Sequence, residues 1–243
     1  MPETRTWDGA AYDRLSTPME EMGREVMDRL ELRGDEVVLD AGCGSGELTA
    51  ELAPRVPRGR VYAVDGSPRM AELARERLGE RATVWVSDLL ELEVPERVDM
   101  VFSAATFHWI ADHERLFARL RAALKPGGRL VAQCGGAGNI AALRAVIEEI
   151  SGDPWMPWNF AGPDETEQRL RAAGFSEARA WLYERPVTPD EPLVFLRTAI
   201  LGEHLERLPE AERDPFARAV LERLGEPFTA RYVRLNIEAT AGP

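Results

Sequence analysis

Cysteine is scarce in this sequence, which has only two such residues among its 243. Cys43 and Cys134 lie in unrelated contexts and lack the close spacing of metal ligands. We therefore expect neither a disulfide framework nor a zinc site, and we predict no metal ion.

Basic residues are outnumbered, with 30 Lys and Arg against 42 Asp and Glu, so the net charge is −12. A surface of this sign repels a phosphate backbone, which disfavours a nucleic-acid substrate. The arginines are scattered among glutamates, as in residues 74–77 (ARER), a pattern typical of solvated helix faces. We expect a small-molecule partner instead.

Long hydrophobic runs are absent as well. No apolar stretch approaches the roughly 20 residues that a membrane span requires, and residues 1–7 (MPETRTW) lack an apolar signal region. We therefore expect a cytoplasmic protein without a membrane partner. Its length of 243 residues suits one domain with an elaboration, as a monomer or a homodimer.

Short β-branched runs alternate with helical segments between residues 36 and 134. The runs are almost continuously apolar, which is typical of strands covered on both faces. This alternation favours a parallel sheet with right-handed crossovers, and residues 125–128 (KPGG) predict a stop between a helix and the next strand. The predicted strands are 37–39, 61–64, 83–86, 100–102 and 130–132, and the predicted helices are 47–55, 69–78 and 113–124.

The flanking residues complete one domain, residues 1–243. Residues 1–35 form a helical cover around an amphipathic helix at 18–32, residues 36–135 form the core, and residues 136–243 contain a cap insertion and the closing strands. The predicted fold class is α/β, with a doubly wound, mainly parallel seven-stranded sheet and a helical and irregular cap. Beyond the core we predict helices at 139–150, 164–173 and 209–224, strands at 175–183 and 231–239, and irregular backbone at 151–160.

The strongest motif is the strand-to-helix turn at residues 40–46 (DAGCGSG). A buried strand ends at Asp40, and the chain then turns through alternate glycines, including Gly42 and Gly44, into a helix. Glycine lets a ligand approach the backbone, and amides at a helix start can bind a carboxylate. A dinucleotide-binding oxidoreductase usually has Gly-x-Gly-x-x-Gly, but Glu47 stands at the third position, so an NAD-dependent enzyme is a distant alternative.

The next strand also ends in an acid. Asp65, followed by Gly66, lies where nucleotide-binding doubly wound folds place a carboxylate on a ribose diol. Ser67 before Pro68 is the better helix cap, which leaves Asp65 for a ligand.

The third strand ends at Asp88, which can accept a hydrogen bond from an adenine amino group while Leu89 packs on the ring. Taken alone, Asp88 is more typical of a turn than of a ligand contact. Met70, one turn into the preceding helix, is placed to cover the adenine, although filling the core is the ordinary role of such a residue.

Together these motifs resemble those of the class I methyltransferases that use S-adenosylmethionine. The resemblance covers residues 1–135 and includes the KPGG segment before the fifth strand. It implies a Rossmann-like sheet, S-adenosylmethionine as cofactor and S-adenosylhomocysteine as product, with the glycine turn against the methionine portion. The implied cofactor-binding residues are Tyr12, Asp40, Gly42, Cys43, Gly44, Asp65, Gly66, Met70, Asp88, Leu89, Ser103 and Ala104.

Two further segments indicate which kind of methyltransferase the sequence resembles. Residues 102–110 (FSAATFHWI) lack the Asn/Asp-Pro-Pro-aromatic signature of enzymes that methylate planar amino groups. Together with residues 7–12 (WDGAAY), they resemble small-molecule methyltransferases of the trans-aconitate methyltransferase type. This resemblance implies O-methylation of a carboxylate or hydroxyl. N- or C-methylation of a metabolite, or a catalytically idle cofactor-binding module, remain open alternatives.

His108 is the candidate catalytic residue, as a proton acceptor near the methyl group, although a structural or positioning role is the more common one for a histidine there. A carboxylate acceptor is ionised at neutral pH and needs no base, whereas a hydroxyl or amine does. The candidate substrate contacts are Trp7, Trp109, Trp155 and Trp158, the last two forming either a lid or a small satellite core.

An anionic substrate would require a local cation in so acidic a protein. Arg14, Arg144 and Arg185 are the candidates in the sequence. His113 and His204 lie on predicted helices, and we expect both on the surface.

Overall fold

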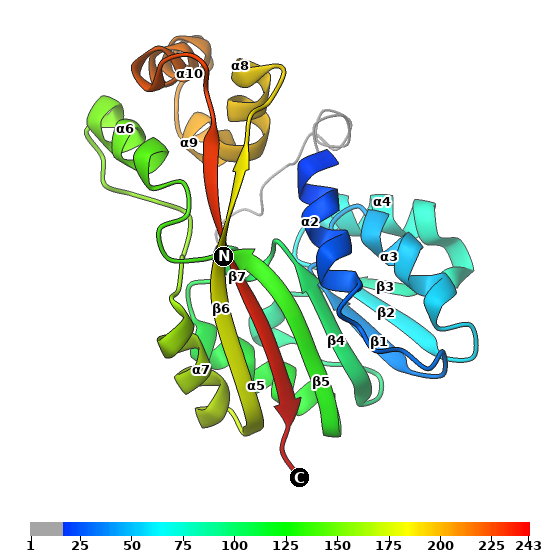
Figure 1. Ribbon diagram of the computed structural model, residues 1–243. Coiled ribbons are helices and arrows are strands. Elements are labelled where there is room, and N and C mark those ends of the chain that lie inside the picture. The colour runs from blue at the N-terminus through cyan, green and yellow to red at the C-terminus, as the bar shows by residue number, and fades with distance from the viewer. Residues whose placement is uncertain (1–16) are drawn as a thin grey trace.

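The computed structural model describes residues 17–243 as a seven-stranded sheet with helices on both faces (Figure 1). The strand order is β3-β2-β1-β4-β5-β7-β6, and only the pairs made by β7 are antiparallel. This confirms the predicted doubly wound, mainly parallel sheet. The strands are β1 (Val37–Ala41), β2 (Arg60–Asp65), β3 (Thr83–Val86), β4 (Val98–Ala104), β5 (Leu124–Gly135), β6 (Phe175–Val187) and β7 (Ala230–Ala241).

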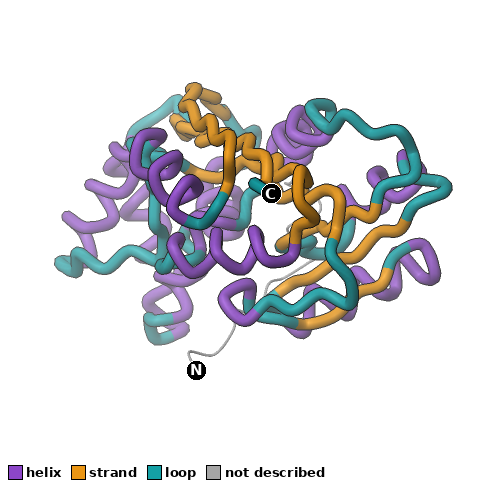
Figure 2. Tube along the Cα trace, turned by 90° about the horizontal axis from the view of Figure 1, so that it is seen from below, coloured by secondary structure: helices purple, strands orange, loops and turns teal. Residues whose placement is uncertain are grey.

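Two layers of helices cover the sheet, and Figure 2 shows strands between helices when the molecule is seen from below. Side chains alternate along a strand, so Val38 faces α2 (Thr17–Met27) and α3 (Glu47–Leu52), while Leu39 faces α5 (His113–Ala123) and α7 (Pro163–Ala172). The helix α4 (Pro68–Leu78) lies on the same face as α3. Burying each such aliphatic side chain contributes about 1.5–3 kcal/mol.

The remaining helices form a cap beside the outer halves of β6 and β7 (Figure 1). Its own apolar cluster includes Leu143, Phe195, Val220 and Tyr232. Residues 188–208 carry no predicted element, because the short helical pieces of this segment lack a readable hydrophobic period. The cap elements are α6 (Ala141–Ser151), α8 (Pro192–Phe195), a π-helical turn (Leu196–Ile200), α9 (Gly202–Glu206) and α10 (Glu210–Leu224).

Two predicted boundaries are wrong by five residues or more. The helix expected at 18–32 ends at Met27, where a turn begins. The fifth strand begins at Leu124, which pairs with Val98, so the predicted stop at residues 125–128 lies inside the strand as an irregularity. Gly127 permits that irregularity because its φ is 74°. In residues 17–243, no helix combines the length and the apolar character needed to cross a membrane.

Candidate functional site

The candidate site lies at the carboxyl ends of the parallel strands. Asp40 of β1 is in register with Ala63 of β2 and Phe102 of β4, so these strands end side by side. The loops that follow them therefore meet at one edge of the sheet, next to the cap.

The glycine turn is held tightly against β2. The amides of Gly42 and Cys43 both donate to the carbonyl of Val64, at 2.8 and 3.0 Å. A Cβ on Gly42 would lie 2.2 Å from the hydroxyl of Thr106, so no side chain fits there. A Cβ on Gly44 would meet nothing within 4 Å, so the turn exposes backbone to open space on that side.

Asp65 faces this open space from the end of β2. Its carboxylate accepts hydrogen bonds from the amides of Gly44 (2.9 Å) and Ser67 (2.8 Å). Burial raises the pKa of Asp65, and the two amides oppose that shift. A carboxylate accepts about four hydrogen bonds, so capacity remains for ligand hydroxyls. Open space at Gly66, where the nearest atom to a Cβ would be 3.9 Å away, adjoins it.

Asp40 lies deeper, with 2% of its surface exposed, and accepts a 2.6 Å hydrogen bond from the hydroxyl of Thr49. Burial raises the pKa of Asp40 to about 7, and the nearby charge of Asp65 adds to the shift while the Thr49 bond opposes it. In this structure Asp40 anchors the helix after the glycine turn. Its contact with a cofactor stays a prediction.

The raised pKa of Asp40 makes stability depend on pH. The folded protein holds this proton up to about pH 7 and the unfolded chain loses it near 3.8, so stability falls as pH rises between these values. Asp40→Asn removes the titrating carboxyl and with it this pH dependence. From about pH 5 to pH 8, the unfolding free energy of the parent should therefore drop by about 2–3 kcal/mol more than that of the variant. Urea unfolding at both pH values measures the difference. Asp88→Asn, which removes an exposed acid from the same edge of the sheet, is the control and should keep the parent's dependence of unfolding free energy on pH. The same dependence in Asp40→Asn would contradict the assignment to Asp40.

The tip of β4 is tied to its neighbours. Ser103 is buried and donates a 2.6 Å hydrogen bond to the carbonyl of Ala41, which holds β4 against β1. Ala104 is half-buried at the edge, and Ala105 donates its amide to the carbonyl of Gln133 at 2.7 Å. The hydroxyl of Thr106 lies 3.0 Å from the carbonyl of Ala104 and 3.2 Å from that of Gly42, so this end of β4 lies beside the glycine turn.

The three predicted adenine contacts differ in exposure. Asp88 is exposed and accepts from the amide of Leu90 (2.9 Å), as the turn interpretation predicted. Leu89 packs in the main core, and Met70 is 6% exposed on α4. Adenine binding by these residues stays a prediction.

A pocket lies between this edge and the cap. Two of its lining residues, Ala105 and Ile140, have left-handed backbone angles (φ 57° and 45°), a strain of about 1–2 kcal/mol each for residues with a Cβ. Such strain is concentrated at functional sites. The pocket is lined by Met19, Ala105, His108, Trp109, Asn139, Ile140, Trp158, Phe160, Ala199, Ile200, Tyr232 and Arg234.

Aromatic rings form one wall of this pocket. Trp158 stacks on Phe160 with 5.6 Å between ring centres and a 10° angle, and Trp109 lies 6.0 Å from Trp158. Trp155, in contrast, packs against His204 (5.2 Å) and under the guanidinium of Arg207 (3.9 Å), away from the pocket lining. Trp7, Tyr12 and Arg14 lie outside the described residues.

His108 is buried and its ring orientation is set by one bond. Its Nδ1 lies 3.3 Å from the backbone amide of Gly135. Since an amide can only donate, Nδ1 accepts and the ring proton is on Nε2. Burial holds the pKa of His108 well below its usual value, and the charge of Arg234 lowers it further. His108 is thus a neutral hydrogen-bond donor.

Arg234 is the charged pocket residue that the sequence analysis did not predict. It is 3% exposed on β7, and its Nε donates to Oε1 of Gln133 at 3.1 Å. A signal was present, since the arginine alternates in phase with Tyr232 and Asn236 in a strand that the fold buries.

The arginines that the sequence suggested are placed differently. Arg185 pairs with Glu21 (3.2 Å) at the surface, and Arg144 packs its guanidinium 5.5 Å from the ring centre of Phe160. The pocket lining includes neither residue.

The surface prediction for two histidines is wrong. His113 is 3% exposed, with its Nε2 2.9 Å from the carbonyl of Phe107, and His204 is 6% exposed between Trp155 and Trp158. Both histidines lie on the inner faces of their helices. The helices are too short for the sequence pattern to show which face is buried.

Known proteins are similar to this chain in sequence and in fold. Residues 38–128 match the model of the methyltransferase domain family. An uncharacterized methyltransferase of Schizosaccharomyces pombe, C70.08c, is 34% identical over 193 residues, 72% of each chain. A trans-aconitate 2-methyltransferase of Paracidovorax citrulli is 31% identical over 240 residues, 93% of this chain and 91% of that protein.

A solved structure agrees at the level of the fold. Phosphoethanolamine N-methyltransferase 2 of Haemonchus contortus, in complex with phosphomonomethylethanolamine and S-adenosylhomocysteine, superposes with a TM-score of 0.66 at 21% identity. The alignment covers 96% of this chain and 57% of that one. By sequence and fold together, this chain belongs to the class I S-adenosylmethionine-dependent methyltransferases, in the group of the trans-aconitate 2-methyltransferases.

Proposed function

We propose that this protein methylates a carboxylate oxygen of a small organic acid. The observation that carries the proposal is a buried cation in the pocket, Arg234, together with a neutral His108 whose remaining ring nitrogen, Nε2, can only donate. A relative of 31% identity is named for an organic acid, trans-aconitate. Arg234 also supplies the local positive charge that a protein of net charge −12 needs to bind an anion.

The residues at the sheet edge fit the methyl donor. The open space at Gly44 admits the amino-acid end, Asp65 has capacity to bind the ribose hydroxyls, and Asp88 can accept from the adenine amino group. When bound, S-adenosylmethionine supplies a methyl group activated by its sulfonium.

The protein's contribution is to hold and orient the acid. The planar guanidinium of Arg234 matches a carboxylate, and correct alignment contributes on the order of 7–11 kcal/mol. The acid is already ionised, so no side chain need remove a proton. A hydroxyl acceptor would need a base, and His108 cannot serve because Nδ1 is engaged by Gly135 and Nε2 carries the proton.

The remaining walls select the body of the acid. Trp158, Phe160, Ile140 and Ile200 present apolar surface to the pocket. Such a wall favours a planar or apolar body attached to the carboxylate.

A screen of organic acids with labelled S-adenosylmethionine tests the proposal. We expect a labelled methyl ester, which alkali hydrolyses to volatile methanol. An alkali-stable product would mean N-, C- or ether methylation and would contradict the proposal. Cofactor binding without any product would instead favour the catalytically idle binding module.

His108→Gln tests the base-free route. The glutamine amide can still donate, so we expect kcat/KM for the acid to fall less than about tenfold, the effect of one neutral hydrogen bond. The rate should keep the parent's pH profile between about pH 6 and pH 8. A loss of about 10²–10⁴-fold would show that His108 acts as a general base.

A further inference from the structure

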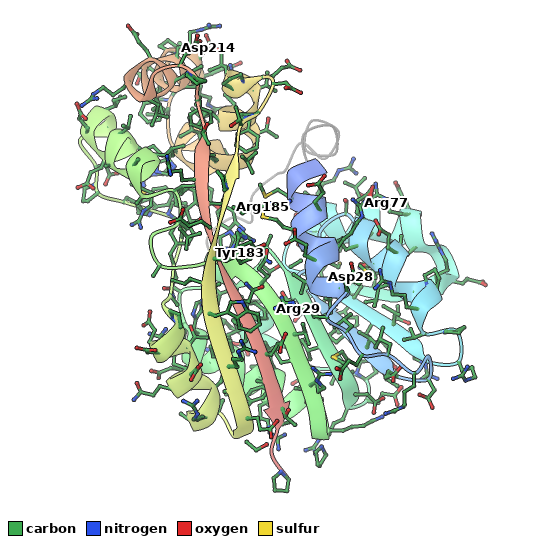
Figure 3. The ribbon with its side chains drawn as sticks, in the orientation of Figure 1. Asp28, Arg29, Arg77, Tyr183, Arg185 and Asp214 are labelled. Atoms are coloured by element: carbon green, nitrogen blue, oxygen red, sulfur yellow. The ribbon has the colours of Figure 1, made fainter. Side chains whose placement is uncertain are left out.

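A chain of hydrogen bonds leads away from the pocket on the face of the sheet that α2 covers. Arg234 of β7 donates from Nε to Oε1 of Gln133 on β5 (3.1 Å). Gln133 donates from Nε2 to the hydroxyl of Tyr183 on β6 (3.3 Å), and Tyr183 donates to Glu25 of α2 (2.8 Å). Figure 3 shows Tyr183 projecting from β6 toward α2.

The two ends of this chain fix its direction. Arginine can only donate and an ionised glutamate can only accept. The proton of Tyr183 is committed to Glu25, so its oxygen must accept from Nε2 of Gln133. That turns Oε1 of Gln133 toward Arg234, and the amide has one orientation.

The sheet register brings these residues together. Arg234 lies opposite Tyr183 on one side and opposite Gly135 on the other, and Gly135 is the residue whose amide orients His108. Gln133 lies opposite Asn236 and donates to its Oδ1 at 3.3 Å. Gln133 is 2% exposed, in a position where an unpaired amide would be costly.

We propose that Gln133 is a positioning residue, which holds the Arg234 guanidinium toward the pocket so that it binds the carboxylate of the acid. Tyr183 and Glu25 fix the amide of Gln133 and thereby connect α2 to the site. This inference rests on the proposed function, because it assigns the role of Arg234 to the acid.

Two substitutions of Gln133 separate positioning from packing. Gln133→Met keeps the length of the side chain and removes the acceptor, so KM for the acid, with trans-aconitate as the probe, should rise about tenfold. Gln133→Glu keeps the shape but sets a carboxylate against Arg234, so KM should rise further, about 100-fold. In both variants kcat and the affinity for S-adenosylhomocysteine should stay within about twofold of the parent.

Arg29→Met is the matched control. Arg29 lies in the turn after α2 and donates to the carbonyl of Ala132 (3.4 Å) and to Glu238 (3.4 Å). Its charge interacts with Tyr183 and Glu25, but it forms no hydrogen bond with Gln133 or Arg234 among the described residues. Its loss should lower the melting temperature and leave KM for the acid unchanged. A rise in KM equal to that of Gln133→Met would mean that docking of α2, and not the amide, is responsible, and would overturn the proposal.

A second readout needs no substrate. The Nε–H proton of Arg234, bonded to Gln133 in a buried site, should exchange slowly with water in the NMR spectrum of the parent. Gln133→Met should lose this protection by at least about tenfold and Tyr183→Phe by less. Unchanged protection in Gln133→Met would refute the positioning role even if no acid were methylated. Slow exchange in a parent that methylates no acid would refute the proposed function alone.

Discussion

Asp65→Ala should reduce the affinity for S-adenosylhomocysteine by about 10²–10⁴-fold, because a carboxylate that binds the ribose as proposed forms two charge-assisted hydrogen bonds of about 1.5–3 kcal/mol each. The carboxylate is already held in place by the amides of Gly44 and Ser67, so little ordering is needed when a diol binds. Calorimetric titration of parent and variant measures the change.

The control must separate the ribose contact from support of the loop. Ser67→Ala removes the hydroxyl that accepts from the amide of Met70 (3.4 Å) and costs about 1 kcal/mol of stability as a lost helix cap. It leaves Asp65 in place, so the affinity should change less than about threefold. If Asp65→Ala bound S-adenosylhomocysteine as tightly as the parent, the assignment of Asp65 to the ribose would be wrong. Binding of NAD by the parent would favour the dinucleotide-binding alternative.

Arg234→Met should lower kcat/KM for an organic acid about 30- to 5,000-fold, which corresponds to about 2–5 kcal/mol. The reason is that the variant lacks the buried cation that, in the proposed function, binds the carboxylate. Methionine is apolar and nearly as long, but it leaves the buried Oε1 of Gln133 without its donor, so we expect the melting temperature to fall. The affinity for S-adenosylhomocysteine should stay near the parent's, which shows that the variant is folded. Initial rates over a range of acid concentrations give the result.

Arg185→Met is the matched control for Arg234→Met. Both variants change the net charge equally, and Arg185 lies on the neighbouring strand β6, where it pairs at the surface with Glu21 (3.2 Å) and Glu25 (3.5 Å). We expect its kcat/KM to remain within about twofold of the parent, since exposed pairs contribute about 1 kcal/mol or less. Equal losses in the two variants would mean that the overall field of the protein, and not contact with Arg234, attracts the acid.

The local sequence was enough to predict the core of the fold and its cofactor edge. Apolar runs of strand length, helical periods between them, and acids at strand ends are patterns within a few residues of one another. Asp65 is an example, since its position after β2 and before a capped helix already indicated an available carboxylate. The short cap helices between residues 188 and 208 escaped because they are stabilised by contacts such as that of Phe195 with Tyr232, far away in the chain.

The sequence by itself therefore determined the parallel sheet, the glycine turn and the family of the chain. Only the tertiary structure decided where the substrate cation lies and what His108 can do. Arg234 reaches the pocket because β7 inserts antiparallel between β5 and β6, which sets it opposite Gly135 and Tyr183. The proton of His108 is placed by the amide of Gly135 on another strand. The physical reason is that strand pairing joins residues about 100 positions apart, whereas sequence patterns report only on near neighbours.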